Sequence, residues 1–418
     1  MSVSLLAPLA NRTFARLFGA QVTALLGTGL LTIALALLAY DIAGAQGGLV
    51  LGFALTLKMV AYVGIAPIAN AVLGHLPRRE LLVALDIVRA AIALMLPFVT
   101  EIWQIYVLIF ALQTASAAFT PTFQATIPDI LPDERTYTSA LSLSRLALDV
   151  ENLASPALAA LLLTLLPANA LFFGTALGFL GSAALVWRAN PPRAASRPAG
   201  NVWQRTSAGT RIFLATPRLR GLFALNFAAA AGGAMVIVNT AVIVGTLFGG
   251  SKASVAIATG AFGVGSMIAA LALPRLLGTL PDRLVMLTGA VGLSVSLIFG
   301  AVILALAPAF AADLWPTYLL WMAATGLAYS TILTPTGRLL RRSADAGERP
   351  ALFAAQFALS HLCWLVTYPL AGLLGAWAGM TTAAVLLGLL AALATLGAMR
   401  LWPRALTDPA ASDGREPG

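Results

Sequence analysis

The stretch from Thr138 to Leu165 reads TSALSLSRLALDVENLASPALAALLLTL and is long and apolar enough to cross a lipid bilayer as a helix. Its middle nevertheless carries four polar residues: Arg145, Asp149, Glu151 and Asn152. Charged groups at membrane depth cost free energy, and they usually face a protein interior or a water-filled cavity where they serve a function. The stretch therefore predicts a membrane protein with functional groups in its interior.

The rest of the chain has the composition that such a protein needs. Of its 418 residues 60% are hydrophobic and only 10% are charged, and the mean hydropathy is +0.90. A helix of roughly 20 apolar residues spans the hydrocarbon core. Apolar runs of this kind occur at residues 14–40, 48–74, 80–99, 102–124, 138–165, 168–188, 219–247, 253–277, 284–307, 314–337, 351–377 and 380–402. We expect an all-α integral membrane protein with twelve transmembrane helices.

The basic residues gather on one side of this topology. If both termini lie inside, the outer segments hold only Lys252, and three further basic residues, Lys58, Arg89 and Arg145, lie within spans. This asymmetry follows the positive-inside rule and predicts that both termini are cytoplasmic. The net charge of +9 then reflects topology and contact with lipid headgroups, not nucleic acid.

The sequence offers little for catalysis or cofactor binding. One cysteine, Cys363, excludes a disulfide framework, and with two histidines it does not make a multi-ligand metal site. No phosphate-binding loop and no hydrolytic triad occur. We expect no metal, no cofactor and no enzymatic activity.

A basic connection divides the spans into two groups of six. Residues 189–217 contain Pro191, Pro192 and Pro198 among several arginines, which is typical of a flexible linker. We expect a first six-helix bundle at 1–188, a cytoplasmic basic linker at 189–217, a second bundle at 218–404 and a disordered cytoplasmic tail at 405–418.

The two groups carry traces of an internal repeat. Three pairs of matching segments occur in the same order: LGHLPRR at 73–79 and LGTLPDR at 277–283, TPT at 120–122 and 334–336, LSRL at 143–146 and LSHL at 359–362. The offsets of 204, 214 and 216 residues indicate a diverged duplication. Duplicated halves are how many secondary transporters place one central site between two bundles.

In span count, inner termini, central linker and loop motif, the chain resembles the major facilitator superfamily from Phe14 to Trp402. The resemblance implies two bundles that rock around a cavity lined by spans one, four, seven and ten. The family's loop after span two carries an aspartate that latches the cytoplasmic side, but Gly74 stands at that position here. The candidates for the latch are Gly74, Arg78, Arg79, Asp86, Arg89 and Asp129.

Within the superfamily the chain resembles bacterial exporters of the drug, siderophore and metal-resistance type. The segment PTFQATIPDILPDE at 121–134 carries this likeness. Residues 155–160, SPALAA, resemble the family's antiporter motif Gly-Pro-x-x-Gly-Gly with small residues in place of glycine, which also permit close helix packing. The resemblance implies export. The histidine-rich tail of nickel exporters is absent, so a metal substrate is disfavoured.

Helical geometry separates the charges of the opening stretch. At 100° per residue, Arg145, Asp149, Asn152 and Pro156 share one stripe, whereas Glu151 faces elsewhere. Arg145 and Asp149 are spaced to pair within the helix. Either this pair takes part in proton coupling, or it is a static ion pair that holds the helix to its neighbours.

Lys58 lies about 14 Å inside span two, at 1.5 Å per residue, and needs an acidic partner. We expect that partner to be Glu151 or Asp149. His361 occupies the repeat position of Arg145. It either binds a proton or the substrate, or it is a hydrogen-bonded packing residue. Candidate cavity residues, for which hydrogen bonding between helices is the alternative role, are Gln113, Asn226, Asn239, Tyr329, Gln356 and Trp364.

The sequence therefore predicts a secondary active transporter, and we expect its partners to be a small organic substrate, protons and membrane lipid. We expect a monomer in a bacterial inner membrane that exports its substrate in exchange for protons by alternating access. An importer or an uncoupled facilitator is the alternative within transport. A channel or a non-transporting sensor is the alternative from another class.

Overall fold

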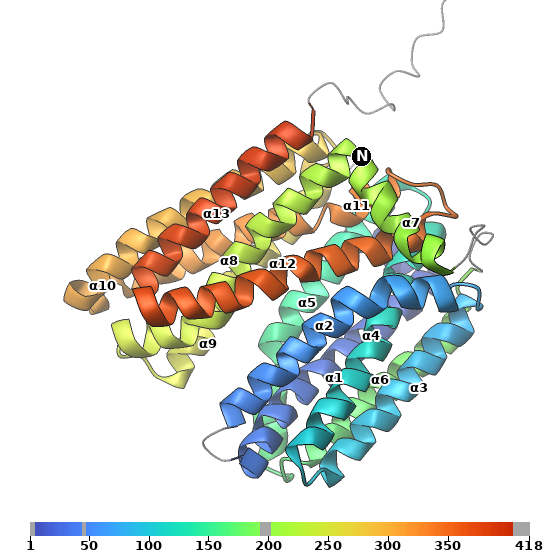
Figure 1. Ribbon diagram of the computed structural model, residues 1–418, viewed down its shortest axis with the longest axis horizontal. Coiled ribbons are helices and arrows are strands. Elements are labelled where there is room, and N and C mark those ends of the chain that lie inside the picture. Colours follow the sequence, from blue (N-terminus) through green and yellow to red (C-terminus); the bar gives the residue numbers. More distant parts are fainter. Residues whose placement is uncertain (1–4, 44–46, 193–201, 404–418) are drawn as a thin grey trace, which may run out of the picture. The chain divides into compact units, whose positions relative to one another are not determined.

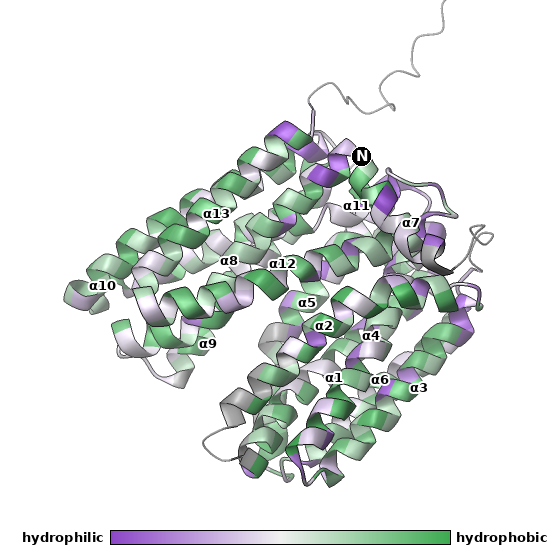
Figure 2. Cartoon of the chain, viewed as in Figure 1, coloured by the Kyte–Doolittle hydropathy of each residue, from purple (hydrophilic) through white to green (hydrophobic). Residues whose placement is uncertain are grey.

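The computed structural model describes residues 5–43, 47–192 and 202–403, and within these ranges it is all-helical, without strands (Figure 1). A helix satisfies its own backbone hydrogen bonds, as a chain in hydrocarbon must. Ten of the described helices are long and apolar enough to cross a membrane. Figure 2 shows hydrophobic residues along most of the helices and hydrophilic ones mainly towards their ends. A multi-pass membrane protein follows from these properties.

Contacts divide the chain into two units. The first unit contains Met1–Ile212 and Leu340–Val366, and the second contains Phe213–Leu339 and Thr367–Gly418. The expected boundaries of the two bundles stay a prediction. The contacts add that residues 340–366 group with the first unit.

The first unit is built mainly from six long helices. Its elements are η1 (Ala7–Ala10), α1 (Arg12–Ala43), α2 (Gly47–Leu73), α3 (Arg78–Met95), η3 (Leu96–Phe98), α4 (Ile102–Ile130), α5 (Glu134–Leu163), α6 (Ala170–Ala189), most of α7 (Val202–Ala215), the end of α11 (Thr336–Arg341) and the beginning of α12 (Arg349–Ala378). Glu101 and Gln104 form a capping box at the start of α4. Such a box satisfies backbone donors that the helix itself leaves free.

Glycines let helices of the first unit approach closely. A Cβ atom on Gly178 of α6 would lie 2.7 Å from the Thr23 carbonyl oxygen and 2.9 Å from Gly27 Cα of α1. No side chain fits in that space, so the two backbones touch there. The helices α1 and α6 therefore form one packed pair.

The second unit contains α8 (Pro217–Leu247), α9 (Lys252–Leu276), α10 (Asp282–Leu333), α13 (Met380–Leu401) and the end of α12. A Cβ atom on Gly265 of α9 would overlap with the Ala323 carbonyl, and one on Gly326 of α10 would overlap with the Phe262 carbonyl. The same small-residue contact thus joins α9 to α10.

The helix α10 is two antiparallel arms joined at Phe310, which is the only residue with non-helical dihedral angles inside it. Ser296 Oγ lies 2.7 Å from Thr325 Oγ1, and the Trp321 indole donates to the Ser296 carbonyl at 2.7 Å. Gly300 lies against the Trp321 ring. Residues that lie at similar distances before and after Phe310 touch, so the helix folds back on itself. This arrangement agrees with the two predicted spans at 284–307 and 314–337.

The count of twelve spans stays a prediction. It would follow if both arms of α10 cross the membrane and if α5 also crosses despite its charges. The expected linker differs from a flexible segment in one respect, because residues 202–215 form α7. A Cβ atom on Gly209 of α7 would overlap with the Ala351 carbonyl of α12, so α7 packs on the start of α12.

Candidate transport site

Arg145 and Asp149 form an ion pair within α5. Arg145 Nη2 lies 3.0 Å from Asp149 Oδ1, and the two side chains are 13% and 3% exposed. The i, i+4 spacing predicts this pair, and the contact confirms it. One residue before, Ser144 donates a hydrogen bond of 2.9 Å to Gln21 Oε1 and joins α5 to α1. A polar layer therefore connects the two helices.

Glu151 lies on another face of α5, against α1. Ser155 Oγ donates to Glu151 Oε1 at 3.3 Å. A Cβ atom on Gly29 of α1 would lie 2.5 Å from Glu151 Oε1 and would overlap with Ser155 Oγ. The carboxylate therefore packs directly against the α1 backbone at Gly29. The side chains of Asn152 and Pro156, which we expected on the stripe with Arg145, lie outside the described residues.

Lys58 on α2 is directed at an aromatic ring. Its Nζ lies 5.6 Å from the centre of the Tyr62 ring, one turn along the same helix, which is a cation–π contact. Its charge acts electrostatically on Glu151, but within the described residues no ion pair of 4.0 Å or less joins Lys58 to a carboxylate. The expected direct pair with Glu151 stays a prediction.

Tyr62 is the centre of a cluster that joins three helices of the first unit. Its hydroxyl donates to Gln113 Oε1 of α4 at 2.9 Å. Its ring centre lies 4.8 Å from that of Phe357 and 4.7 Å from that of His361, both on α12. We name Lys58, Tyr62, Gln113, Phe357 and His361 the α2–α4–α12 cluster. Three of its members were expected at the site, and Tyr62 was not, although it lies one helical turn from Lys58.

The imidazole of His361 has a defined tautomer when it is neutral. Its Nδ1 lies 2.7 Å from the Phe357 carbonyl oxygen. Since a carbonyl only accepts, Nδ1–H is the donor, and Nε2 keeps its lone pair. The half-buried ring thus offers a hydrogen-bond acceptor in addition to its aromatic contacts.

The other cavity candidates divide between the units. Gln356 is buried and Trp364 half-buried on α12 in the first unit, whereas Asn226, Asn239 and Tyr329 lie in the second. Asn239 Nδ2 donates to the Ala371 carbonyl at 3.2 Å and links α8 to α12. Tyr329 packs against Phe262 of α9, with ring centres 5.5 Å apart. For Asn239 this geometry fits hydrogen bonding between helices.

The latch candidates fall into two groups. Arg78 Nη1 lies 2.6 Å and Arg349 Nη1 3.2 Å from the carboxylate of Asp129 at the end of α4. Asp86 and Arg89 instead pair with each other inside the first unit. The guanidinium of Arg89 lies between Phe119 and Phe179, 4.0 and 4.5 Å from the ring centres.

Gly74, which stands where the resemblance places the latch aspartate, has no space for a side chain in this structure. A Cβ atom on Gly74 would overlap with the Asn70 carbonyl oxygen, to which the Gly74 amide donates at 3.0 Å. The C-terminal end of α2 therefore leaves no space for a side chain at position 74. The remaining candidate, Arg79, donates to Asn190 Oδ1 at 3.2 Å.

Residues that the sequence did not single out extend this network within the first unit. Arg342 Nε lies 2.5 Å from Glu134 Oε1, and Arg341 donates to the carbonyl oxygens of Leu131 and Pro132. With Arg349, these side chains tie the segment before α12 to the connection between α4 and α5. The only sequence signal for these contacts was the large number of arginines in the inner segments.

An ion pair also lies at the loop of the second unit whose sequence matches residues 73–79. Asp282 occupies the repeat position of Arg78, at the offset of 204 residues. Its Oδ1 lies 3.3 Å from Nε of Arg338, whose Nη1 also donates to the Leu277 carbonyl at 2.9 Å. Each of the two matched loops thus takes part in an ion pair, through Arg78 in the first and Asp282 in the second.

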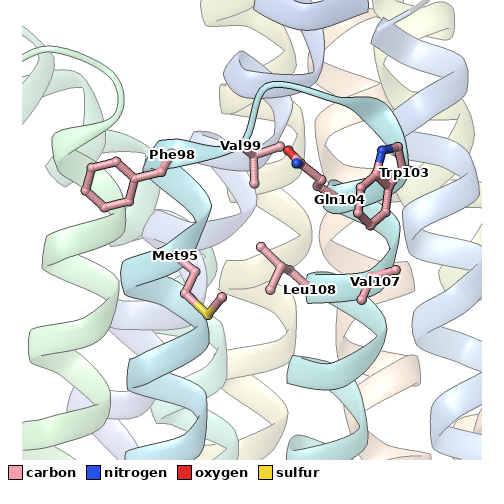
Figure 3. A pocket seen from close by; sticks show the side chains of 7 residues that line it. All are labelled: Met95, Phe98, Val99, Trp103, Gln104, Val107 and Leu108. Atoms are coloured by element: carbon pink, nitrogen blue, oxygen red, sulfur yellow. The ribbon is translucent and has the colours of Figure 1, made fainter.

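One surface groove of about 450 Å³ lies at the end of the α3–α4 hairpin (Figure 3). Four of its side chains, Met95, Phe98, Trp103 and Val107, are more than half exposed. The lining residues are Met95, Phe98, Val99, Trp103, Gln104, Val107 and Leu108. None of the predicted site residues is among them, so this groove is not the expected transport site.

Solved structures of transporters share the fold. The human organic anion transporter MFSD10 (TETRAN) has a TM-score of 0.78 at 13% identity, over 93% of this chain and 99% of that one. A bacterial homologue of the iron transporter ferroportin, in its outward-facing state, has a TM-score of 0.73 at 14% identity, over 93% and 99%. The transporter FucP in its outward conformation has a TM-score of 0.68 at 14% identity, over 93% and 98%.

No curated protein sequence matches the chain. The sequence model of a family described as transmembrane secretion effector matches residues 3–337, which is most of the chain. The expected fold class is thereby confirmed, and membrane transport of a small molecule, not enzymatic catalysis, is the activity of such proteins. This chain belongs to the transmembrane secretion effector family of the major facilitator superfamily.

Proposed function

We propose that this chain is a secondary active transporter that exports a small organic compound across a bacterial inner membrane in exchange for protons. Both termini are cytoplasmic in this proposal, the protein acts as a monomer, and transport follows alternating access. The direction is supported by the secretion function in the family's description and by the antiporter-like segment at 155–160.

The environment of Glu151 carries the proposal. Among the described residues, each of the three buried acids pairs with an arginine: Asp86 with Arg89, Asp149 with Arg145 and Asp282 with Arg338. Glu151 has a hydroxyl partner, Ser155, but no basic atom within 4.0 Å in the described part of the chain. A carboxylate outside an ion pair can gain or lose a proton without leaving a buried cation unpaired. Glu151 is therefore our candidate for the proton carrier.

Exchange requires that proton and substrate exclude each other. An ionised Glu151 can accept a hydrogen bond from the substrate or form an ion pair with a positively charged group on it. Protonation of Glu151 weakens this attraction. The α2–α4–α12 cluster supplies aromatic faces, an amide and an imidazole acceptor for the rest of the molecule. The proposed site is thus Glu151 together with this cluster.

The test uses inverted membrane vesicles, a panel of organic compounds and a recording of the internal pH. An exporter accumulates substrate in these vesicles, and an acidic interior should increase the accumulation. Glu151→Gln keeps the shape of the side chain but should remove the response to the imposed gradient. Asp313→Asn, which changes an exposed acid of α10, should leave the response intact.

Each alternative predicts a different result. Accumulation that ignores the gradient in the wild type contradicts proton coupling and leaves an uncoupled facilitator. Substrate that leaves the vesicles against its gradient indicates an importer. The expected charge pair is tested separately by exchanging Lys58 and Glu151: if neither the single changes nor the exchange transports, a direct pair is contradicted.

A further inference from the structure

Three arginines meet where the ends of α1, α3 and α6 come together in the first unit. Arg16 donates from Nη1 to the carbonyl oxygen of Arg188, near the end of α6. Arg79, at the start of α3, donates to Asn190 Oδ1 just beyond α6. We name Arg16, Arg79 and Arg188 the arginine cluster. These contacts fix the cluster to the packed helices, since α6 packs against both α1 and α3.

The cluster keeps positive charge that the described part of the protein does not neutralise. Arg16 and Arg188 are exposed, and the guanidinium of Arg188 has no hydrogen-bond or ion-pair partner within the described residues. Glu80, whose side chain is half exposed, lies 3.7 Å from Arg79 Nε and offsets part of the charge. At least one net positive charge therefore remains for an external anion.

An exposed apolar stripe on α6 leads to the cluster. Phe173, Leu177, Leu180 and Trp187 are 44%, 69%, 43% and 52% exposed. At 100° per residue they fall within about 80° of one another, and they extend over about 21 Å of helix. That length exceeds one leaflet, about half of the ~30 Å hydrocarbon core. An acyl chain can therefore follow the stripe through a whole leaflet.

Trp187 joins the stripe to the cluster. The guanidinium of Arg79 lies 4.0 Å from the centre of its ring. Tryptophan prefers the level of the lipid headgroups, and arginine binds phosphate with a planar fork of donors. The apolar stripe, Trp187 and the arginine cluster thus follow one another along the protein. The acyl chain, the glycerol and the phosphate follow one another in the same order in a phospholipid.

We propose that the arginine cluster and the α6 stripe bind one anionic phospholipid, with its phosphate at Arg16, Arg79 and Arg188 and an acyl chain along Phe173–Trp187. The occupant is a membrane lipid and not a soluble phosphate, because the cluster adjoins an apolar track that a free phosphate does not need. The site is distinct from Glu151 and from the α2–α4–α12 cluster.

The test follows the melting temperature of the purified full-length protein in a neutral detergent. Phosphatidylglycerol should raise it in a saturable manner, whereas phosphatidylcholine and soluble glycerophosphate should not. Arg16→Gln, Arg79→Gln and Arg188→Gln should each raise the half-saturating concentration about fivefold, since one cation near a membrane surface contributes about 1 kcal/mol. Arg135→Gln, which changes an exposed arginine at the start of α5, is the matched control.

Three results would overturn the proposal. These are an equal loss in Arg135→Gln, an equal shift with phosphatidylcholine, and a full shift with glycerophosphate alone. A second measurement requires no variant: mass spectrometry should find anionic phospholipid retained over zwitterionic phospholipid through detergent washing of the wild type. Retention without a headgroup preference also contradicts the site.

Discussion

Arg349 Nη1, at the start of α12, lies 3.2 Å from Asp129 Oδ1, although 220 positions separate the two residues. The other oxygen of the same carboxylate accepts from Arg78 at 2.6 Å. The side chain of Arg78 is 4% exposed and that of Arg349 is 20% exposed. One carboxylate therefore neutralises a buried cation and a more accessible one.

Replacing Asp129 should lower the free energy of unfolding more than replacing Arg349. Asp129→Asn leaves Arg78 buried without a counter-charge, and such a loss destabilises by about 3–5 kcal/mol. Arg349→Gln removes one partially exposed partner and should cost about 1 kcal/mol or less. Unfolding in detergent measures both. Equal losses in the two variants would show that Asp129 does not hold the contact together.

The Arg145–Asp149 pair is predicted to be structural. Asp149→Asn should lower stability by about 3–5 kcal/mol, because Arg145 stays charged inside the protein. The double variant Arg145→Met, Asp149→Leu should recover most of this loss and should still respond to a proton gradient. If the double variant is stable but transports without proton coupling, Asp149 takes part in coupling and our assignment to Glu151 is incomplete.

Gly29 is predicted to be a site where a single methyl group is harmful. Gly29→Ala forces the new Cβ into Ser155 Oγ and Glu151 Oε1. Overpacking of this kind costs about 1–3 kcal/mol. The matched control is Gly64→Ala in α2, where the new Cβ meets nothing within 4 Å. Melting temperature and transport rate should fall for Gly29→Ala alone, and equal values for both variants would contradict the close α1–α5 contact.

Asp133 should stabilise the protein in a pH-dependent manner. It caps α5, and hydrogen bonds from the Thr136 hydroxyl and amide hold the pKa of its carboxyl below the usual value. Because the folded-state pKa is the lower one, the stabilisation is complete above the unfolded pKa and is lost as pH falls through the folded pKa. Asp133→Ala should cost about 1 kcal/mol at neutral pH and less at lower pH, where the protonated carboxyl is a weaker acceptor than the carboxylate.

The control for this titration is Asp133→Asn, whose amide oxygen accepts the same bonds without a charge. Its stability relative to Asp133→Ala should not depend on pH. Unfolding curves from neutral to strongly acidic pH compare the three proteins. A constant difference between wild type and Asp133→Ala over this range would show that the carboxylate does not act as the cap.

The sequence predicted what helical geometry determines locally. Arg145 and Asp149 pair because residues four apart lie on one face. The same geometry does not say which helix lies opposite, so the contact of Tyr62 with Phe357 and His361 could not be anticipated. Hydropathy likewise predicted two spans around residue 310 without showing that they pack directly against each other.

Other features depend on space that only the fold defines. Gly74 looks like the loss of a latch residue until the Asn70 carbonyl is seen to occupy the place of a side chain. Asp86 and Arg89 were expected among the residues of the latch, which lacks its aspartate at Gly74. They pair with each other instead, since burial makes each the most favourable partner for the other.

The chain passes between its two units three times, and each passage occurs inside a helix: α7, α11 and α12. A gene divided at the linker would therefore not encode two complete units. The first product would lack residues 340–366, which supply Arg341, Arg342, Arg349 and His361 to its contacts. The boundary at which the sequence divides into two parts is thus not the boundary at which the structure does, and the first part of the sequence does not contain one complete unit.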